Sequence, residues 1–323
     1  MNIGEFYKLI VDEGIKQDPR SRPEILKFLN TVKDEYSKLP PAEKEAFDKE
    51  KLSNPYGDTR ILFGLPKTNI KTIMVGIDIE TPELLLADRL RSKGERIDLV
   101  AGHHPIGFAR MNLHKVMGVL RDILKGMGVS GKNIDKMVDE RIEEVFRKSV
   151  AGNHPRTTDA ARLLNIPLLC MHTVADNFAY QYFNNLLKKK KPSRVCDILD
   201  LIYKVPEYRI AMKNGQGPKV ILGKNSNKCG KVLIEMTGGT EGPKDIYNQL
   251  AKGKVTTLIC MHLSEDHFKK AKKHNFNIII AGHISSDTLG INLLLDKVEK
   301  RQKLNVISCS GFTRIRRNEN SQL

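Results

Sequence analysis

The strongest constraint on the fold is a regular alternation of short apolar segments with amphipathic ones. Residues 70–79 (IKTIMVGIDI) have the β-branched content of a buried strand, residues 81–92 have helical spacing, and residues 97–102 (IDLVAG) are apolar again. The helical segment opens with Thr-Pro-Glu, which is typical of a helix start and makes Thr81 the expected cap. A strand, a helix and a second strand in this order predict parallel strands in an α/β fold.

The same alternation continues to the end of the chain. A helix near 158–164 is followed by a strand at 166–171 and a helix near 177–187. A further helix is expected at 195–205, before strands at 231–236, 255–261, 277–281 and 304–308 and helices around 244–251, 265–273 and 287–301. The pattern predicts a two-lobed α/β sandwich with mostly parallel strands.

Breaks in this pattern suggest how the chain is divided. Residues 1–58 have helical periodicity and no chemical motif, so we predict an N-terminal helical extension. Residues 59–187 form the first predicted α/β lobe, interrupted by a helical insertion at about 106–150. Residues 188–323 form the second predicted lobe, with the KKKKPS run at 188–193 as the linker.

Composition limits the class of protein. The longest apolar runs have the length of strands and fall far short of the roughly 20 residues of a membrane span. The N-terminal sequence lacks the pattern of a signal peptide. Five scattered cysteines, never in C-x-x-C spacing, argue against a disulfide framework, so we predict a cytoplasmic protein.

The formal net charge of +16 leaves the choice of partner open. Basic residues are spread along the chain, which favours a solvated surface, and a small anionic or nucleotide-like substrate is the second interpretation. Nucleic acid is the least favoured alternative, because no nucleic-acid-binding motif accompanies the charge. The glycine-rich segment 237–242 could hold an anionic group, although a simple turn explains it better.

Four histidines directly follow apolar, strand-like segments. The segments DLVAG, PLLCM, TLICM and IIIAG precede His103, His172, His262 and His283. The carboxyl ends of parallel strands meet at one edge of a sheet, where α/β proteins bind their ligands. Imidazoles that meet carboxylates there suit zinc, iron, manganese or nickel.

Carboxylates follow two of these histidines at a fixed spacing. Asp176 lies four positions after His172, and Asp287 lies four positions after His283 at an expected helix start. Residues four apart lie on one face of a helix, about one turn apart, and the simpler interpretation of one such pair is a local hydrogen bond or ion pair. Ser285 or Ser286 is the expected cap of that helix.

His103 and His104 are adjacent and precede Pro105. In a regular strand they would face opposite sides, but at a strand exit they can serve two neighbouring metal ions, which a carboxylate can bridge. The simpler alternative is that each histidine only bonds a nearby carbonyl group, and the repeated pattern counts against it. His154, His262 and His267 are weaker candidates for the same edge.

Three of these segments resemble the motifs of the Nif-three-like family, often described as GTP cyclohydrolase I type 2 homologues. The segments are AGHHP, HTVAD and GHISSD, and the resemblance covers about residues 60–312. It implies a two-lobed fold that often forms a hexamer, and a dinuclear metal centre. The implied ligands of two divalent ions are His103, His104, Asp176, His283 and Asp287, with His172 beside them.

This chain departs from the family pattern in two places. The last ligand is usually Glu, so Asp287 is one methylene shorter, and the insertion at 106–150 is not typical. We expect a metal-dependent hydrolase of the GTP cyclohydrolase type 2 kind, in which the metal ions activate water. The alternative is a metal-binding interaction or regulatory protein without catalysis. The sequence names neither the metal, the substrate nor the catalytic acid or base.

Overall fold

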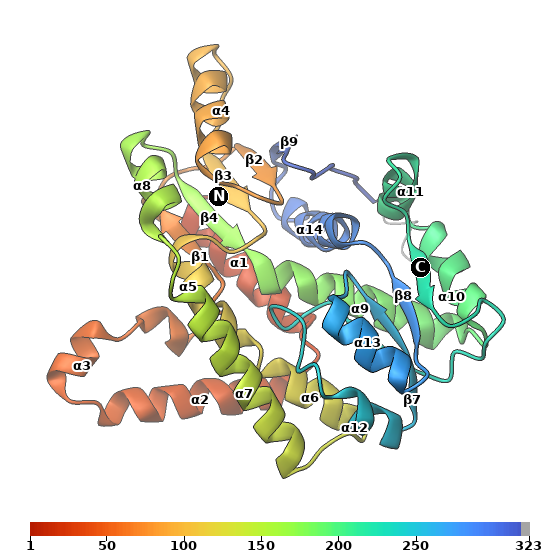
Figure 1. Cartoon of the computed structure of the whole chain (residues 1–323). Coiled ribbons are helices and arrows are strands. Elements are labelled where there is room, and N and C mark those ends of the chain that lie inside the picture. Colours follow the sequence, from red (N-terminus) through yellow and green to blue (C-terminus); the bar gives the residue numbers. More distant parts are fainter. Residues whose placement is uncertain (318–323) are drawn as a thin grey trace.

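The computed structural model describes residues 1–317, which form two mostly parallel sheets with helices between and around them (Figure 1). The first sheet has the order β1-β4-β3-β2-β9, and the second has the order β5-β8-β7-β6. This arrangement confirms the predicted α/β fold. The strands are β1 (Thr59–Phe63), β2 (Thr72–Gly76), β3 (Leu99–Gly102), β4 (Leu168–Met171), β5 (Lys219–Leu222), β6 (Lys231–Glu235), β7 (Val255–Cys260), β8 (Asn277–Ile280) and β9 (Asn305–Cys309).

The parallel strands of the first sheet end level with one another. Gly76 of β2 pairs with Gly102 of β3, which in turn pairs with Cys170 of β4. Strand β9 lies parallel to β2 on its other side, although it follows all the strands of the second sheet in the sequence. This register places His103 and His172, which follow β3 and β4, next to each other.

Each sheet also has one antiparallel edge strand, which the sequence pattern did not predict. Strand β1 pairs with β4 and strand β5 pairs with β8, and each pairing contains a register shift. Both strands are short and largely half-buried, so neither has the continuous apolar run of the central strands.

Two long helices, α9 (His172–Lys190) and α14 (His283–Glu299), pack against each other between the two sheets (Figure 1). Their apolar residues contribute to the cores beneath both sheets. Gly290 of α14 allows a close approach, because a Cβ atom there would lie 2.3 Å from the carbonyl oxygen of Ala175 in α9. The first turn of α9 therefore lies close to the middle of α14.

The N-terminal region is helical, as predicted. Helix α1 (Ile3–Lys16) packs against α9 and α14, and its apolar face belongs to the core of the first sheet. Helices α2 (Arg22–Lys38) and α3 (Pro41–Ala46) extend away from the sheets, as Figure 1 shows at the lower left, and the short helix η1 (Lys49–Leu52) leads back to β1.

The predicted helical insertion is also confirmed, and it joins the two halves of the molecule. It consists of α5 (Gly107–Val116), α6 (Val119–Gly126) and α7 (Lys132–Ser149). Apolar residues of α6 and α7, such as Ile123 and Val138, share a core with Leu258 of the second sheet. Helix α5 of the insertion packs against the first sheet, whereas α6 and α7 pack against the second.

The remaining helices complete the cover of the two sheets. They are α4 (Thr81–Ser92) and α8 (Pro155–Leu163) beside the first sheet, and α10 (Val195–Tyr203), α11 (Pro206–Lys213), α12 (Tyr247–Lys252) and α13 (Glu265–Lys273) around the second. Helices α10 and α11 share a core with α9 and α14 on one face of the second sheet, whereas α12 and α13 lie on its other face with α6 and α7. Within residues 1–317, every helix is too short or too polar to span a lipid bilayer.

Several expected helix boundaries were wrong. Helix α4 is capped by Glu80 rather than Thr81, because Thr81 already has helical geometry. Helix α14 begins at His283 with Gly282 as its cap, so both serines lie inside it. Helix α9 likewise begins at His172 and includes most of the lysine run expected as a linker. The domain boundaries themselves remain predictions, and residues 318–323 of the second predicted lobe lie outside the described residues.

Candidate metal centre

The predicted metal ligands meet between the two sheets, at the first turns of α9 and α14. His103 and His104 follow the carboxyl end of β3, Asp176 lies in the first turns of α9, and His283 and Asp287 lie in the first turns of α14. Strands β3 and β4 belong to one sheet and β8 belongs to the other. The carboxyl ends of strands from both sheets therefore supply one site, as parallel α/β topology predicts.

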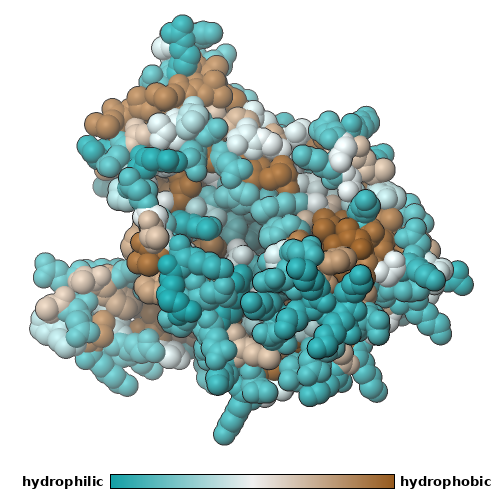
Figure 2. Space-filling model, in the orientation of Figure 1, coloured by the Kyte–Doolittle hydropathy of each residue, from teal (hydrophilic) through white to brown (hydrophobic). Residues whose placement is uncertain are grey.

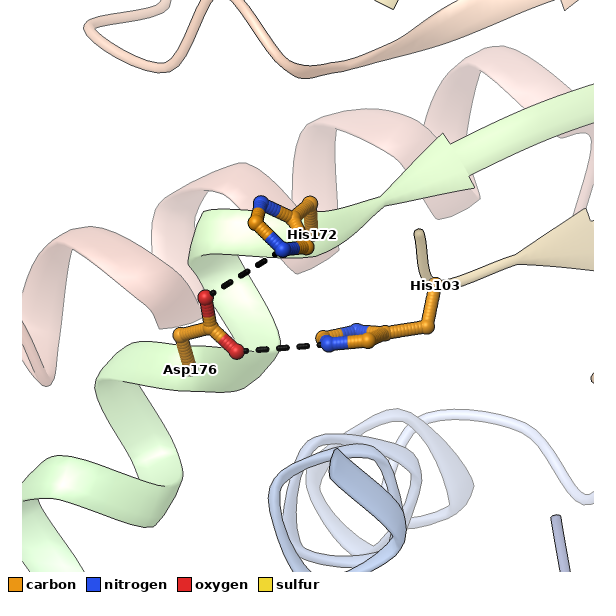
Figure 3. Close-up of side chains that lie close together, drawn as sticks. All are labelled: His103, His172 and Asp176. Carbon is orange, nitrogen blue, oxygen red and sulfur yellow. Dashed lines mark ion pairs between the residues drawn. The ribbon is translucent and has the colours of Figure 1, made fainter. Parts of the chain in front are cut away.

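Two groups of side chains have the geometry to hold a metal ion. One contains His103, His172 and Asp176 (Figure 3), and the other contains His103, His104 and Asp287. In each group the ligand atoms all lie within 4.8 Å of one another. His103 belongs to both groups, so the two candidate positions are neighbours.

The distances inside the site connect all five predicted ligands. His103 Nε2 lies 3.3 Å from Asp176 Oδ1 and 3.3 Å from Asp287 Oδ1. The other oxygen of Asp287 lies 3.3 Å from His104 Nε2 and 3.7 Å from His283 Nε2. Asp287 thus faces His103 with one oxygen and the pair His104 and His283 with the other.

Several buried polar atoms at this point have no hydrogen-bond partner within residues 1–317. They are both ring nitrogens of His103, Oδ1 of Asp176 and both carboxylate oxygens of Asp287. A buried polar group without a partner typically costs about 1–3 kcal/mol, and more when it is charged. A cation bound between His103 Nε2 and the two carboxylates would satisfy those atoms, so the residues present fit a metal ion.

Two carboxylates outside the predicted ligand set orient the histidine rings. Asp58 Oδ2 lies 2.8 Å from His172 Nδ1 and accepts a hydrogen bond from the Thr173 hydroxyl. Asp78 Oδ1 lies 2.7 Å from His104 Nδ1. Each bond turns the ring so that Nε2 faces the other ligands, an arrangement that metal-binding histidines generally require.

Sequence reasoning missed both of these acids, although one signal was available. Asp78 follows β2 by two positions, so the strand-end rule that selected the histidines would also have selected it. Asp58 precedes β1, an edge strand that was not predicted, and no pattern in the sequence pointed to it.

The ionisation of the site differs from one ligand to the next. Burial alone would lower the pKa of the His103 ring, but the carboxylates of Asp287 and Asp176 raise it to about 10. Burial would raise the pKa of Asp287, but His103 and His104 hold it well below its usual range. Burial lowers the pKa of His283. The buried side of the site therefore holds a positive charge strongly, as a cation site does.

Of the weaker candidates, His262 reaches the site and His267 does not. The ring of His262 lies 4.7 Å from that of His283, centre to centre, and its Nδ1 lies 3.5 Å from Glu241 Oε1. Burial would raise the pKa of Glu241, but bonds from His262 and Ser264 lower it to about 2. His267 instead contacts the hydroxyl of Tyr247 with its Nδ1, at 3.1 Å.

A cavity of about 680 Å³ opens beside the partly exposed ligands. His104, His172, His262 and His283 line one part of it, and His154 lines another, where its Nε2 lies 2.7 Å from the Ser149 carbonyl oxygen. Figure 2 shows a hollow near the middle of this face, bordered mostly by hydrophilic residues. The volume lies within the range of small-molecule sites.

Comparison with solved structures identifies the fold. A NIF3 superfamily protein from Sphaerobacter thermophilus is similar, with a TM-score of 0.71 and 24% identity over 94% of this chain and 97% of that chain. Reduced HcgD from Methanocaldococcus jannaschii has a TM-score of 0.48 and 14% identity over 83% and 94% of the two chains. The protein TTHA1606 from Thermus thermophilus has a TM-score of 0.47 and 13% identity over 92% and 100%.

No protein-family model and no curated protein sequence matches this chain. The structural likeness nevertheless extends over nearly the whole of both chains for the Sphaerobacter thermophilus protein. The chain therefore has the fold of the NIF3 superfamily, which confirms, for the fold, the resemblance indicated by its three histidine motifs.

Proposed function

We propose that this protein binds two divalent metal ions and uses them in a hydrolytic reaction. The proposed ligands are His103, His104, Asp176, His283 and Asp287. The observation that carries the proposal is the set of buried nitrogen and oxygen atoms without hydrogen-bond partners, which face one another over 3.3 Å.

The residues divide between two neighbouring positions. His103 and Asp176 belong to the inner position, with His172 either as a further ligand or as a support for Asp176, 3.6 Å away. His104 and His283 belong to the outer position, and their Nε2 atoms lie 3.3 Å apart. Asp287 faces His103 with one oxygen and His104 with the other, so it would contribute a ligand to both positions.

Paired divalent ions, when bound, lower the pKa of water and stabilise negative charge on a reacting oxygen. The chain provides the surroundings that such chemistry needs. Asp58 and Asp78 fix the rings of His172 and His104, so the ligands do not have to reorganise. The cavity gives a substrate access to the outer position, where His283 has a 39% exposed side chain.

Mixed imidazole and carboxylate ligands suit iron, zinc, manganese or nickel. Elemental analysis of the purified protein tests the metal proposal directly, with two ions per chain expected. A turnover screen of the metal-loaded protein with nucleotides, cyclic amides and phosphodiesters tests hydrolysis. Metal at this stoichiometry without any turnover would favour the alternative, a metal-binding interaction or regulatory protein. Protein that takes up no metal would contradict both.

We further propose that the protein forms a homo-oligomer, up to a hexamer, as the Nif-three-like resemblance implies. Light scattering on the purified protein tests this, and a monomer would contradict it. The five cysteines are free in the structure, which supports our proposal of a reducing, cytoplasmic location.

A further inference from the structure

The cavity beside the metal centre combines two kinds of lining. His104 and His283 line it at the metal centre, whereas the insertion and the start of α8 contribute four basic residues. These are Arg110 of α5, Arg141 and Lys148 of α7 and Arg156 of α8. Since all of these residues line one cavity, a ligand held by the basic residues lies within reach of the outer metal position.

We propose that the substrate carries a phosphate group and that the insertion binds it, with Arg110 as the principal contact. This inference rests on the proposed function for the location of the reacting bond. It adds the chemical class of the substrate and gives the insertion a role in selecting it.

The basic residues differ in how far the protein already neutralises them. Arg141 donates to the Glu144 carboxylate at 2.8 Å and Lys148 pairs with the same group at 2.7 Å. Arg156 pairs with Glu80 at 2.5 Å. Arg110 is exposed, and within residues 1–317 its guanidinium has neither an ion pair nor a hydrogen bond. It is therefore the cation of this cavity that is free to bind an anion.

Arg141 is positioned more firmly than the other cations. Its Nε donates to the carbonyl oxygen of Glu241 at 3.0 Å, and its side chain is only 15% exposed. The pKa of Glu144 is lowered to about 2 by Lys148 and Arg141, so this acid stays charged and keeps both cations in place. A fixed guanidinium and a free one that line the same cavity suit a phosphate group, whose oxygens accept several hydrogen bonds at once.

Part of the remaining lining suits the organic part of such a substrate, while Asp78 and Glu80 add two carboxylates to the same cavity. Apolar side chains of Ile79, Ile106, Leu113 and Val145 line the same cavity. A volume of about 680 Å³ holds a phosphorylated molecule of drug-like size rather than a single inorganic ion. The ligand therefore combines a phosphate with an apolar or aromatic body.

Phenylphosphonate tests this proposal, because its carbon–phosphorus bond resists hydrolysis. Its Kd for the full chain would be measured by calorimetry, both as purified and after treatment with a chelator, beside benzoate and benzyl alcohol. We expect phenylphosphonate to bind more tightly than either comparison compound. Arg110→Ala should weaken its binding about tenfold, the loss expected for one hydrogen bond to a charged group.

Matched variants separate the contact from a general charge effect. Arg110→Lys should retain part of the affinity, and Arg89→Ala, which removes an exposed arginine of α4 outside the cavity, should leave the Kd unchanged. Equal binding of benzoate and phenylphosphonate would overturn the phosphate assignment, and an unchanged Kd in Arg110→Ala would overturn the site. Elemental analysis of each variant is read separately, so a failure of metal binding does not count as a failure of this proposal.

Discussion

The inner and outer halves of the candidate metal centre are built from the same residue types but in different surroundings. On the inner side, His103 is fully buried and Asp176 is 5% exposed. On the outer side, the side chains of His104 and His283 are 23% and 39% exposed and line the cavity. The inner position is therefore closed by protein, whereas the outer position is open to solvent and ligands.

This contrast suggests that the two positions have different roles, one structural and one catalytic. Metal sites that serve a structural role are closed, whereas catalytic sites keep an open coordination position. Burial would lower the pKa of His103 and of His104, but nearby carboxylates raise both, whereas burial lowers the pKa of the more exposed His283. We expect the inner ion to bind more tightly and the outer ion to exchange and to meet the substrate.

The largest effect is expected from Asp287→Ala, because this residue faces both positions. Its loss removes a ligand from each and leaves His103 and His104 without the carboxylate that lies 3.3 Å from both. Metal affinity should fall by more than about 100-fold, since even removing a residue that only hydrogen-bonds to a metal ligand lowers metal affinity by about 10–100-fold. Calorimetric titration with Zn²⁺ or Mn²⁺ measures this, with Asp159→Ala on exposed α8 as the control. Retention of two ions at wild-type affinity would rule out a bridging Asp287.

A matched pair of variants tests whether the inner position depends more than the outer one on the carboxylate that orients its histidine. Asp58→Asn weakens the support of His172 where the carboxylate is fully buried, and we expect a loss of about 10–100-fold in affinity for the inner ion. Asp78→Asn acts on His104, but the Asp78 side chain is 60% exposed, so water can replace it and the loss should stay below about tenfold. Metal titrations of the two proteins in parallel decide this, and a larger loss in Asp78→Asn would reverse the assignment of inner and outer roles.

The pH dependence of metal binding should reflect the raised pKa of His103. A metal ion must displace the proton from this ring, so affinity should rise with pH, by about tenfold per unit, until the pH approaches 10. In the metal-free protein, His103 contributes stability that is fully present below pH 6.5 and is lost as the pH rises toward 10. The difference in Tm between loaded and metal-free protein should therefore increase from pH 6 to pH 9. A constant difference would contradict a charged His103.

The smallest effect is expected from Glu241→Gln, which lies just beyond the outer position. His262, its partner, belongs to neither candidate metal group, so metal affinity should change by less than about threefold. Because the pKa of Glu241 is lowered to about 2, this acid contributes stability above pH 4.5 that is lost as the pH falls toward 2. The variant should therefore lose less stability between pH 5 and pH 2 than the wild type does, as followed by urea unfolding. A large loss of metal would instead make His262 part of the centre.

The central features of the fold could be predicted because they depend on local sequence patterns. Buried parallel strands are continuous apolar runs, and the segment that became β3 was recognisable for this reason. The edge strands β1 and β5 lack this signature because part of each strand faces solvent. The return of β9 to the first sheet could not be predicted, because no local pattern records which strand will be its neighbour.

In the candidate site too, the residues that follow local sequence patterns could be predicted, and those that depend on long-range contacts could not. Strand-end position and i,i+4 spacing selected His103, Asp176 and Asp287, which the structure brings together. The role of Asp58 depends on a contact with His172, 114 positions away in the sequence. A contact between residues so far apart produces no recognisable spacing pattern in the sequence. Likewise, nothing in the sequence showed that Arg110 of the insertion would line the same cavity as His283.

The place of β9 has a consequence for how the protein matures. Helix α14, which carries His283 and Asp287, is followed by a strand that must insert beside β2 from the opposite end of the chain. Such long-range pairing is slow and cannot begin before the ribosome has released most of the polypeptide. If the protein binds metal ions as we propose, we expect the complete set of ligands to come together only after α14, which carries His283 and Asp287, has been synthesised.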